Sequence, residues 1–198
     1  MKLDKSFISA VLLAAGESSR MGEFKQLLSF GRSTFVEQVV DALLGSAVAE
    51  VIVVVGHWAE AVIERIGSRP VKITQNPDYK QGMSTSIIAG LKLVTPETGA
   101  VMIALSDQPL LNSRTINNLI DGFLSGGKGI AIPTYRGIRG HPIIFAKKYV
   151  AELMAVKGDI GGRQIISAHP EDVLEVAVAS EGVVVDINTG DDYHSHLG

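Results

Sequence analysis

The fold is decided near the N-terminus by the stretch Ile8-Ser9-Ala10-Val11-Leu12-Leu13-Ala14, which leads directly into Ala15-Gly16-Glu17-Ser18-Ser19-Arg20-Met21-Gly22. Apolar residues at consecutive positions predict a strand buried on both faces, and such strands are typical of a parallel sheet covered by helices. The small and polar residues that follow predict a loop at the carboxyl end of this strand. Open α/β sheets bind their ligands at that edge.

Apolar runs and segments with helical spacing alternate along the rest of the chain. Strands are predicted over residues 8–14, 51–55, 71–74, 100–105, 129–133 and 183–187. Helices are predicted over residues 34–44, 59–66, 84–94, 113–124, 147–154 and 162–168. Residues 139–145 predict an added strand that pairs antiparallel near the sheet edge, because no helix separates it from the strand before it. The pattern indicates a doubly wound, mostly parallel, Rossmann-like α/β fold.

Length and composition narrow the class of protein. The 198 residues show no linker, so one domain spanning residues 1–198 is expected. The net charge is 18 − 21 = −3, without long runs of one sign, which disfavours a nucleic-acid binder or a membrane-surface protein. The absence of cysteine excludes disulfides, thiolate zinc sites and cysteine nucleophiles.

The first residues imitate a short signal peptide, since Lys2 and Lys5 precede an apolar run. Asp4 in the basic region and the direct continuation into the loop favour a buried strand instead. No apolar stretch approaches the roughly 18 residues that a membrane span needs. A cytoplasmic protein is therefore expected.

The first loop has the chemistry of an anion site. Gly16 and Gly22 allow the backbone to approach a ligand closely, and Arg20 and Lys25 bring two cations to the end of the first strand. Glu23 follows Gly22 where a Walker A loop needs lysine, and the dinucleotide fingerprint G-x-G-x-x-G is absent at this turn. The loop is thus predicted to hold phosphate in another way.

The order of residues in this loop is more specific than any one of them. The run Leu13-Ala14-Ala15-Gly16-x-Ser18-x-Arg20-Met21-Gly22, followed by Lys25 and Leu27-Leu28, resembles the signature of nucleotidyltransferases of the molybdenum cofactor type. The resemblance implies a fold like that of nucleotide-diphospho-sugar transferases, with Lys25, Arg20 and Asp107 as catalytic residues. It implies a nucleotide site made of Leu13, Ala14, Ala15, Gly16, Ser18, Arg20, Lys25, Gly82, Ser84 and Asp107.

A second loop indicates which base is bound. Gly82-Met83-Ser84-Thr85-Ser86 opens a predicted helix, so its N–H groups and hydroxyls could meet a base or ribose, although Ser84 could equally be an ordinary N-cap. The loop resembles the element of the molybdenum cofactor cytidylyltransferases, whereas the guanylyltransferases carry a G-P-L-A-G type loop. CTP is therefore the expected nucleotide.

Two carboxylates follow apolar runs. Asp107 lies in Ser106-Asp107-Gln108-Pro109, and the family's D-x-P element carries the metal ligand. Asp186 resembles the first residue of the family's D-I-D-T-P-E-D ending, from which this chain departs at Asn188 and Gly190. The resemblance implies that Asp107 and Asp186 hold Mg²⁺, with Mn²⁺ as the alternative, because Mg²⁺ is bound by one or two carboxylates and substrate phosphates. A lone Asp after a strand could also be a helix cap.

The second substrate is expected on the C-terminal side. Arg139-Gly140-His141-Pro142 and Lys157-Gly158-Asp159-Ile160-Gly161-Gly162-Arg163 resemble two further elements of the family, which implies acceptor binding by His141 and Arg163. A structural histidine and a solvent-facing arginine are the plainer interpretations.

The resemblance runs from Ile8 to Tyr193 and implies transfer of CMP from CTP to the phosphate of molybdopterin, with release of pyrophosphate. One alternative keeps the chemistry with another base or acceptor, as in guanylyl transfer to molybdopterin. A second is a cofactor-binding maturation factor for a molybdenum hydroxylase, and an apo-hydroxylase is a conceivable partner of the enzyme too. Release of pyrophosphate separates an enzyme from a maturation factor.

Overall fold

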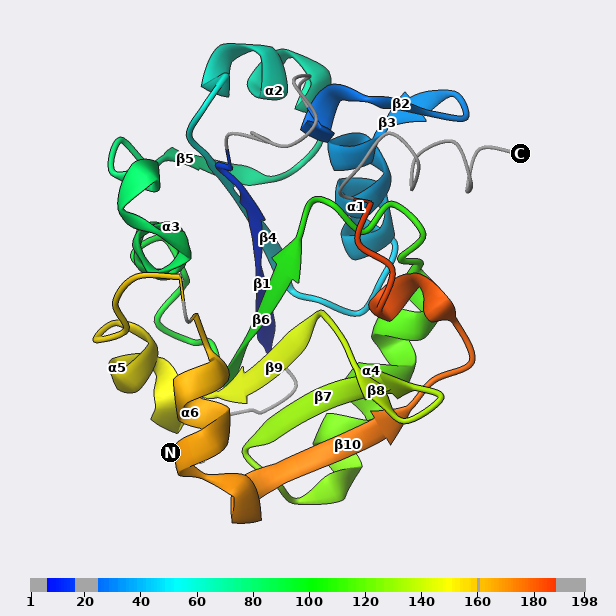
Figure 1. Cartoon of the computed structure of the whole chain (residues 1–198), viewed down its shortest axis with the longest axis vertical. Coiled ribbons are helices and arrows are strands. Elements are labelled where there is room, and N and C mark those ends of the chain that lie inside the picture. Colours follow the sequence, from blue (N-terminus) through cyan, green and yellow to red (C-terminus); the bar gives the residue numbers. More distant parts are fainter. Residues whose placement is uncertain (1–6, 17–24, 160, 188–198) are drawn as a thin grey trace.

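The computed structural model describes residues 7–16, 25–159 and 161–187. One mixed sheet forms the centre, with helices on both of its faces (Figure 1). Its strands are β1 (Ile8–Ala14), β4 (Glu50–Val55), β5 (Lys72–Gln75), β6 (Ala100–Leu105), β7 (Ile130–Tyr135), β8 (Ile138–Arg139), β9 (Ile143–Ala146) and β10 (Val173–Ala177). A separate antiparallel pair is formed by β2 (Ser29–Phe30) and β3 (Ser33–Thr34).

The helices cover the sheet in two layers. They are α1 (Phe35–Leu44), α2 (Ala59–Ile66), α3 (Met83–Leu91), α4 (Ser113–Gly126), α5 (Val150–Leu153) and α6 (Arg163–Ala168). Helix α1 contacts α2 and α4, while α3 contacts α5 and packs against β1 and β4. The caps follow the sequence: the Glu37 carboxylate accepts from the Thr34 N–H at 2.8 Å, and Asn112 accepts from the Thr115 N–H at 2.9 Å.

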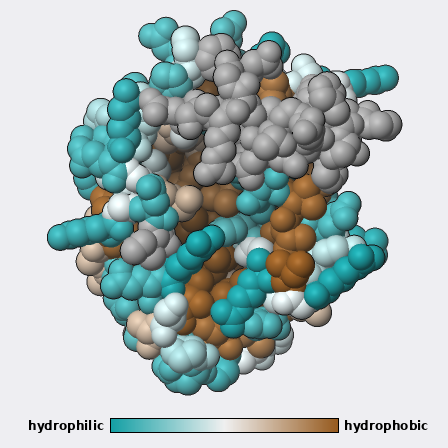
Figure 2. Space-filling model, in the orientation of Figure 1, coloured by the Kyte–Doolittle hydropathy of each residue, from teal (hydrophilic) through white to brown (hydrophobic). Residues whose placement is uncertain are grey.

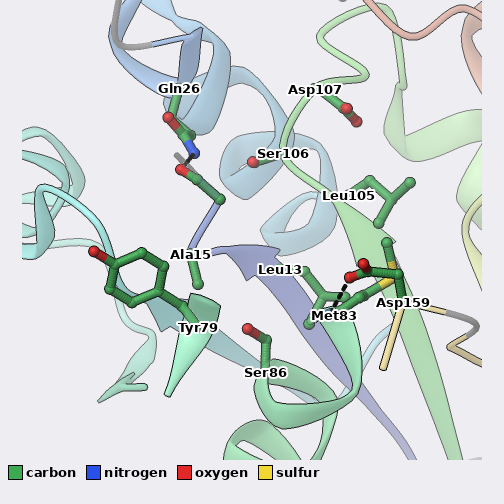
Figure 3. Close-up of a pocket in the computed structure, with 11 residues that line it drawn as sticks. Leu13, Ala15, Gln26, Tyr79, Met83, Ser86, Leu105, Ser106, Asp107 and Asp159 are labelled. Carbon is green, nitrogen blue, oxygen red and sulfur yellow. Dashed lines mark hydrogen bonds between the residues drawn. The ribbon is translucent and has the colours of Figure 1, made fainter. Parts of the chain in front are cut away.

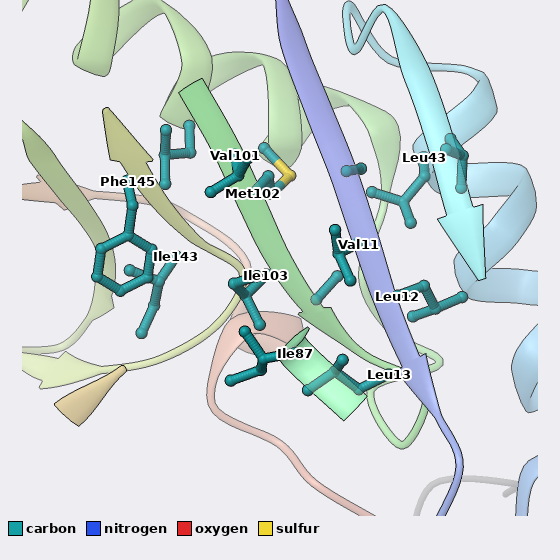
Figure 4. Packing of buried hydrophobic residues seen from close by; sticks show 14 of the residues in the cluster. Val11, Leu12, Leu13, Leu43, Ile87, Val101, Met102, Ile103, Ile143 and Phe145 are labelled. Carbon is teal, nitrogen blue, oxygen red and sulfur yellow. The ribbon is translucent and has the colours of Figure 1, made fainter. Parts of the chain in front are cut away.

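The strand order is β10-β7-β9-β6-β1-β4-β5, with β8 paired to β7. Strand β1 lies parallel between β4 and β6, as its continuous apolar sequence predicts. All seven residues of β1 are buried. Val11, Met102 and Ile103 lie in the core between the sheet and its helices (Figure 4). Each such side chain contributes about 1.5–3 kcal/mol through burial.

The added antiparallel strand lies inside the sheet, so its predicted place near the edge is wrong. Strand β9 pairs antiparallel with β6 on one side and β7 on the other. Its four residues are all buried, which explains why it occupies the interior. The edge beyond β7 belongs to β10, which the sequence analysis missed because its residues are half-buried or exposed.

The strand predicted over residues 183–187 is also wrong. A 3₁₀ turn at Glu181–Val183 is followed by irregular chain up to Ile187. Val183 and Ile187 are fully buried, but the segment bonds to loops: the Val183 carbonyl accepts from the His141 N–H at 2.8 Å, and the Ile187 N–H donates to the Asp107 carbonyl at 3.1 Å. Its apolarity therefore reflects packing over the end of the sheet.

A polar cluster joins the residue before β7 to the 3₁₀ turns Lys147–Tyr149 and Pro170–Asp172. The Asp172 carboxylate accepts from the Tyr149 hydroxyl at 2.6 Å and the Gly129 N–H at 3.0 Å, and Lys148 Nζ lies 2.6 Å from it. Burial alone would raise the pKa of Asp172, but these hydrogen bonds outweigh it and lower the pKa from 3.8 to about 2.

We expect the Asp172 cluster to make unfolding pH-dependent in acid. A depressed carboxyl pKa contributes stability above the unfolded value near 4, and this contribution is lost as pH falls towards 2. Asp172→Asn should lower the free energy of unfolding by about 1–2 kcal/mol at pH 7 and flatten its fall between pH 4 and 2, as measured by urea denaturation. Glu171→Gln, at the exposed neighbouring carboxylate, is the control and should change neither. An unchanged acid profile in Asp172→Asn would contradict this assignment.

Candidate active site

The parallel strands β1, β4 and β6 end at the same edge of the sheet, at Ala14, Val55 and Leu105. Two cavities open there. This is the edge at which open α/β sheets bind ligands. Figure 2 shows the face of the molecule with apolar side chains on the floor of a hollow and hydrophilic side chains around it.

The first cavity has a volume of about 310 Å³. Leu13, Ala15 and Gly16 form one wall, and Gln26, Tyr79 and Ser86 come from three other segments (Figure 3). Gln26 donates through Nε2 to the Gly16 carbonyl at 2.8 Å, and the Ala15 carbonyl accepts from the His57 N–H at 3.2 Å. The end of β1 is thus held on both sides, which gives the cavity a fixed wall.

The second cavity, of about 550 Å³, lies on the other side of β6. Arg139, His141 and Arg163 line it, together with Asp107 and Asp186. With Asp159, which also lines it, the cavity holds two guanidinium groups and three carboxylates, a set that can bind both an anionic ligand and a cation. The resemblance implied His141 and Arg163 as acceptor residues, and these two residues lie in the same cavity.

Asp107 and Asp159 belong to the walls of both cavities, as do Met83 and Leu105. Asp107 lies two residues after the end of β6, so the strand places its carboxylate at the boundary between the two cavities. The sequence analysis quoted Asp159 in a motif but assigned it no role. A ligand in one cavity would therefore meet a ligand in the other beside Asp107.

The N-terminus of α3 is already occupied by the chain itself. The Met83 N–H donates to the Asp159 carboxylate at 3.0 Å, and the Ser84 N–H donates to the Gly158 carbonyl at 3.0 Å. Gly82 has φ +110°, and a Cβ there would come within 2.6 Å of the Gly158 backbone, so only glycine fits this close approach. These N–H groups were expected to be open to a base or ribose, and that expectation is wrong for Met83 and Ser84.

The segments that carry Asp107 and Asp186 are joined by hydrogen bonds. The Ile187 N–H donates to the Asp107 carbonyl, and Gln108 Nε2 donates to Asp186 Oδ1 at 2.8 Å. Within the described part of the chain, no three histidine or carboxylate side chains cluster as a metal site. A pair of carboxylates nevertheless fits Mg²⁺ or Mn²⁺, because substrate phosphate oxygens and water complete the coordination of such ions.

The positive charge of the second cavity comes from its two arginines and not from His141. Burial lowers the pKa of His141, the nearby Arg163 lowers it further, and attraction to Asp107 opposes this change. His141 is therefore neutral at pH 7 and can accept or donate a hydrogen bond without adding charge. Arg139 forms an exposed ion pair with Glu175, with Nη2 2.6 Å from the carboxylate, so part of its charge is compensated outside the cavity.

The remaining predicted residues fall into three groups. Ala14 and Ser84 are buried and, like Gly82, lie outside the cavity walls. Ser18 and Arg20 lie outside the described residues. Lys25 begins the 3₁₀ turn Lys25–Leu27 that brings Gln26 to the first cavity, and its side chain is likewise outside what the structure describes.

Sequence reasoning missed Gln26, Tyr79 and Ser86 as wall residues. Ser86 carried a signal, since it ends the quoted serine-rich loop. Gln26 stands next to Lys25 in the first motif. Tyr79 gave no signal, because it reaches the site only through the packing of the turn Tyr79–Gln81.

Comparison with known proteins identifies the family. The pattern of the MobA-like NTP transferase domain matches residues 10–173. The chain belongs to this family. As a MobA-like protein it is 32% identical to the nicotine blue oxidoreductase of Paenarthrobacter nicotinovorans, over 92% of this chain and 94% of the relative. It is 29% identical to the molybdenum cofactor cytidylyltransferase of Escherichia coli K12, over 95% and 94% of the two chains.

Solved structures agree with this MobA-like assignment and with the predicted fold class. A homologue of Rv0371c from Mycobacterium sp. strain JC1 superposes with a TM-score of 0.85 at 28% identity, covering 98% of this chain and 96% of that one. Rv0371c of Mycobacterium tuberculosis in complex with manganese gives 0.81 at 26% identity, covering 96% and 98%. Among the described residues of the MobA-like chain, no helix is long and apolar enough to cross a membrane.

Proposed function

We propose that this protein transfers CMP from CTP to the phosphate of molybdopterin, forming the cytosine dinucleotide cofactor and pyrophosphate. One observation carries the proposal: Asp107 lies in the walls of two adjoining cavities. A transferase must hold the donor and the acceptor next to each other, and the Asp107 carboxylate lies where the two cavities meet. The first cavity is assigned to CTP and the second to molybdopterin.

Ser86 supports a pyrimidine in the first cavity. Asn76 donates through Nδ2 to Ser86 Oγ at 3.0 Å, and its Oδ1 accepts from the Asp78 N–H at 3.0 Å, which fixes the orientation of the amide. Because Ser86 accepts this bond, its own proton can be donated to a ligand. The edge of cytosine offers O2 and N3 as acceptors, whereas N3 of uracil carries a proton.

The second cavity suits an anionic acceptor larger than a phosphate ion. Its volume is about 550 Å³, and Arg163, together with the Glu175-paired Arg139, supplies positive charge on its walls. Arginine binds phosphate through two parallel hydrogen bonds. The neutral His141 provides a further polar contact, as expected for a molecule that joins a phosphate to a polar ring system.

A divalent metal is assigned to Asp107 and Asp186, and the relative crystallised with manganese supports this. When bound, such an ion neutralises charge on phosphate oxygens. The acceptor phosphate attacks the α-phosphorus of CTP, a P–O bond forms, and the bond to pyrophosphate breaks. Lys25 and Arg20 offset the charge on the leaving pyrophosphate. A phosphate is already a nucleophile at neutral pH, so no general base is required.

The test is pyrophosphate release with each of the four nucleoside triphosphates, with and without molybdopterin, in Mg²⁺. We expect release that depends on both CTP and molybdopterin, with CTP preferred over GTP on the order of 10⁴-fold because a purine would leave polar groups unpaired. Equal turnover of GTP would replace the cytidylyl assignment by the guanylyl one. Nucleotide binding without pyrophosphate release would favour a maturation factor.

Two serine variants refine the test. Ser86→Ala should lower kcat/KM for CTP about 10- to 100-fold and narrow the preference over UTP, because one directed hydrogen bond to the base is lost. Ser84→Ala is the matched control, since Ser84 is buried outside the cavity wall. Equal losses in the two variants would contradict the role of Ser86.

The relative named nicotine blue oxidoreductase gives a second candidate, an oxidoreductase acting in the same two cavities. The anion-binding loop would suit a dinucleotide reductant as well as CTP. Oxidation of NADH or NADPH by a dye substrate, without pyrophosphate release, would favour this candidate. The carboxylate pair Asp107 and Asp186 favours the transferase, because a divalent metal held by carboxylates neutralises charge on phosphate oxygens.

A further inference from the structure

Gln108 follows Asp107 at the carboxyl end of β6 and is 1% exposed. Its Nε2 donates to Asp186 Oδ1 at 2.8 Å and to the Val183 carbonyl at 3.1 Å. Both amide protons are thereby engaged, so the orientation of the side chain is set by its two acceptors. The amide joins the segment that carries Asp107 to the segment that carries Asp186.

The oxygen of the same amide shows that stability alone does not explain this residue. Gln108 Oε1 is buried and has no hydrogen-bond partner among residues 7–16, 25–159 and 161–187. A buried polar atom without a partner is destabilising, and each such atom in a native structure calls for an explanation. The geometry offers an explanation in the nitrogen of the same amide, because Gln108 Nε2 donates a hydrogen bond to the Asp186 carboxylate.

Asp186 lies on a segment without regular secondary structure. Residues 184–187 are irregular chain, and Asp186 itself is exposed. The Val183 carbonyl accepts from both the Gln108 amide and the His141 N–H, so these bonds connect Gln108 to a residue that lines the second cavity. An exposed carboxylate on irregular chain samples several rotamers unless a neighbour fixes one.

We propose that Gln108 is a positioning residue for Asp186: its Nε2 bond holds the carboxylate in the direction required to bind a divalent cation. The inference rests on the metal role assigned to Asp186 above. Partners that orient metal ligands typically change metal affinity 10- to 100-fold when they are removed.

The test measures Mn²⁺ binding alone, by electron paramagnetic resonance without nucleotide. Gln108→Leu should raise the Kd for Mn²⁺ about 10- to 100-fold while the protein stays folded by near-ultraviolet circular dichroism. Gln38→Leu is the matched control, since its Nε2 donates to Ser33 Oγ away from both cavities, and it should leave the Kd unchanged. Gln108→Met takes the place of the leucine variant should that one fail to fold.

A double-mutant cycle separates positioning from a general structural effect. In an Asp186→Asn background, Gln108→Leu should cause no further loss of Mn²⁺ affinity. An equal loss in both backgrounds, or an unchanged Kd in Gln108→Leu, would overturn the proposal. So would an unchanged Kd in Asp186→Asn alone. CTP-dependent pyrophosphate release is measured separately, so failure of the cytidylyl assignment is distinguishable from failure of this inference.

Discussion

Turnover should fall a hundredfold or more when Asp107 is replaced by asparagine. The substitution removes one negative charge from the boundary of the two cavities and preserves the shape of the side chain. A metal-held charge is worth several kcal/mol in the transition state, and each 1.4 kcal/mol is about tenfold in rate. The measurement is kcat for pyrophosphate release at saturating CTP and molybdopterin, together with the melting temperature.

The melting temperature should hardly change in Asp107→Asn, because the segment is held by backbone bonds such as that from the Ile187 N–H to the Asp107 carbonyl. Asp121→Asn, an exposed aspartate on α4, is the control for loss of one carboxylate and should keep full activity. Near-normal kcat in Asp107→Asn would remove Asp107 from the catalytic site.

The second large effect is expected at Lys25. Lys25→Ala should lower kcat/KM for CTP more than a hundredfold, which corresponds to a loss of about 3 kcal/mol of transition-state stabilisation. The substitution removes a cation that offsets charge on the leaving pyrophosphate. Lys25 directly precedes Gln26, which lies in the same turn and lines the first cavity, and this supports a position of Lys25 near the nucleotide. Steady-state kinetics with varied CTP measures the effect.

Lys92→Ala provides the comparison for Lys25→Ala, since Lys92 is an exposed lysine at the opposite end of α3. It should leave kcat/KM within twofold of the unmodified protein. If Lys25→Ala changed only the melting temperature, the lysine would be structural and the loop would hold phosphate through other groups.

Much of the fold could be predicted because its signals are local. The continuous apolar run of β1 reports burial on both faces, and the boundaries of β1, β6 and α2 agree with the sequence prediction. The order of residues in the first loop and the D-x-P element likewise indicated a nucleotidyltransferase. Each of these signals resides in one short continuous stretch, the longest being Leu13 to Leu28, where local pattern and family resemblance are informative.

Other features depend on contacts between distant segments. Residues 143–146 are all buried and form an interior strand. The run 183–187 is apolar apart from Asp186 and buried at Val183 and Ile187, yet it forms a loop. Hydrophobicity reports that a segment is buried and does not report what it pairs with. The neighbouring strands decide whether such a segment joins the sheet. Strand β9 pairs with both β6 and β7, and β10 occupies the edge beyond β7.

The site divides in the same way. The sequence by itself determined the chemical types at the end of the sheet: a glycine-rich loop with cations, Asp107 after a strand, and arginines near the C-terminal motifs. Only the tertiary structure decided that Asp159 caps α3, that Ser86 lines the cavity while Ser84 is buried, and that Gln108 holds Asp186. The physical reason is that hydrogen-bond geometry between segments 75 or more positions apart is set by packing of the whole core, on which local spacing carries no information.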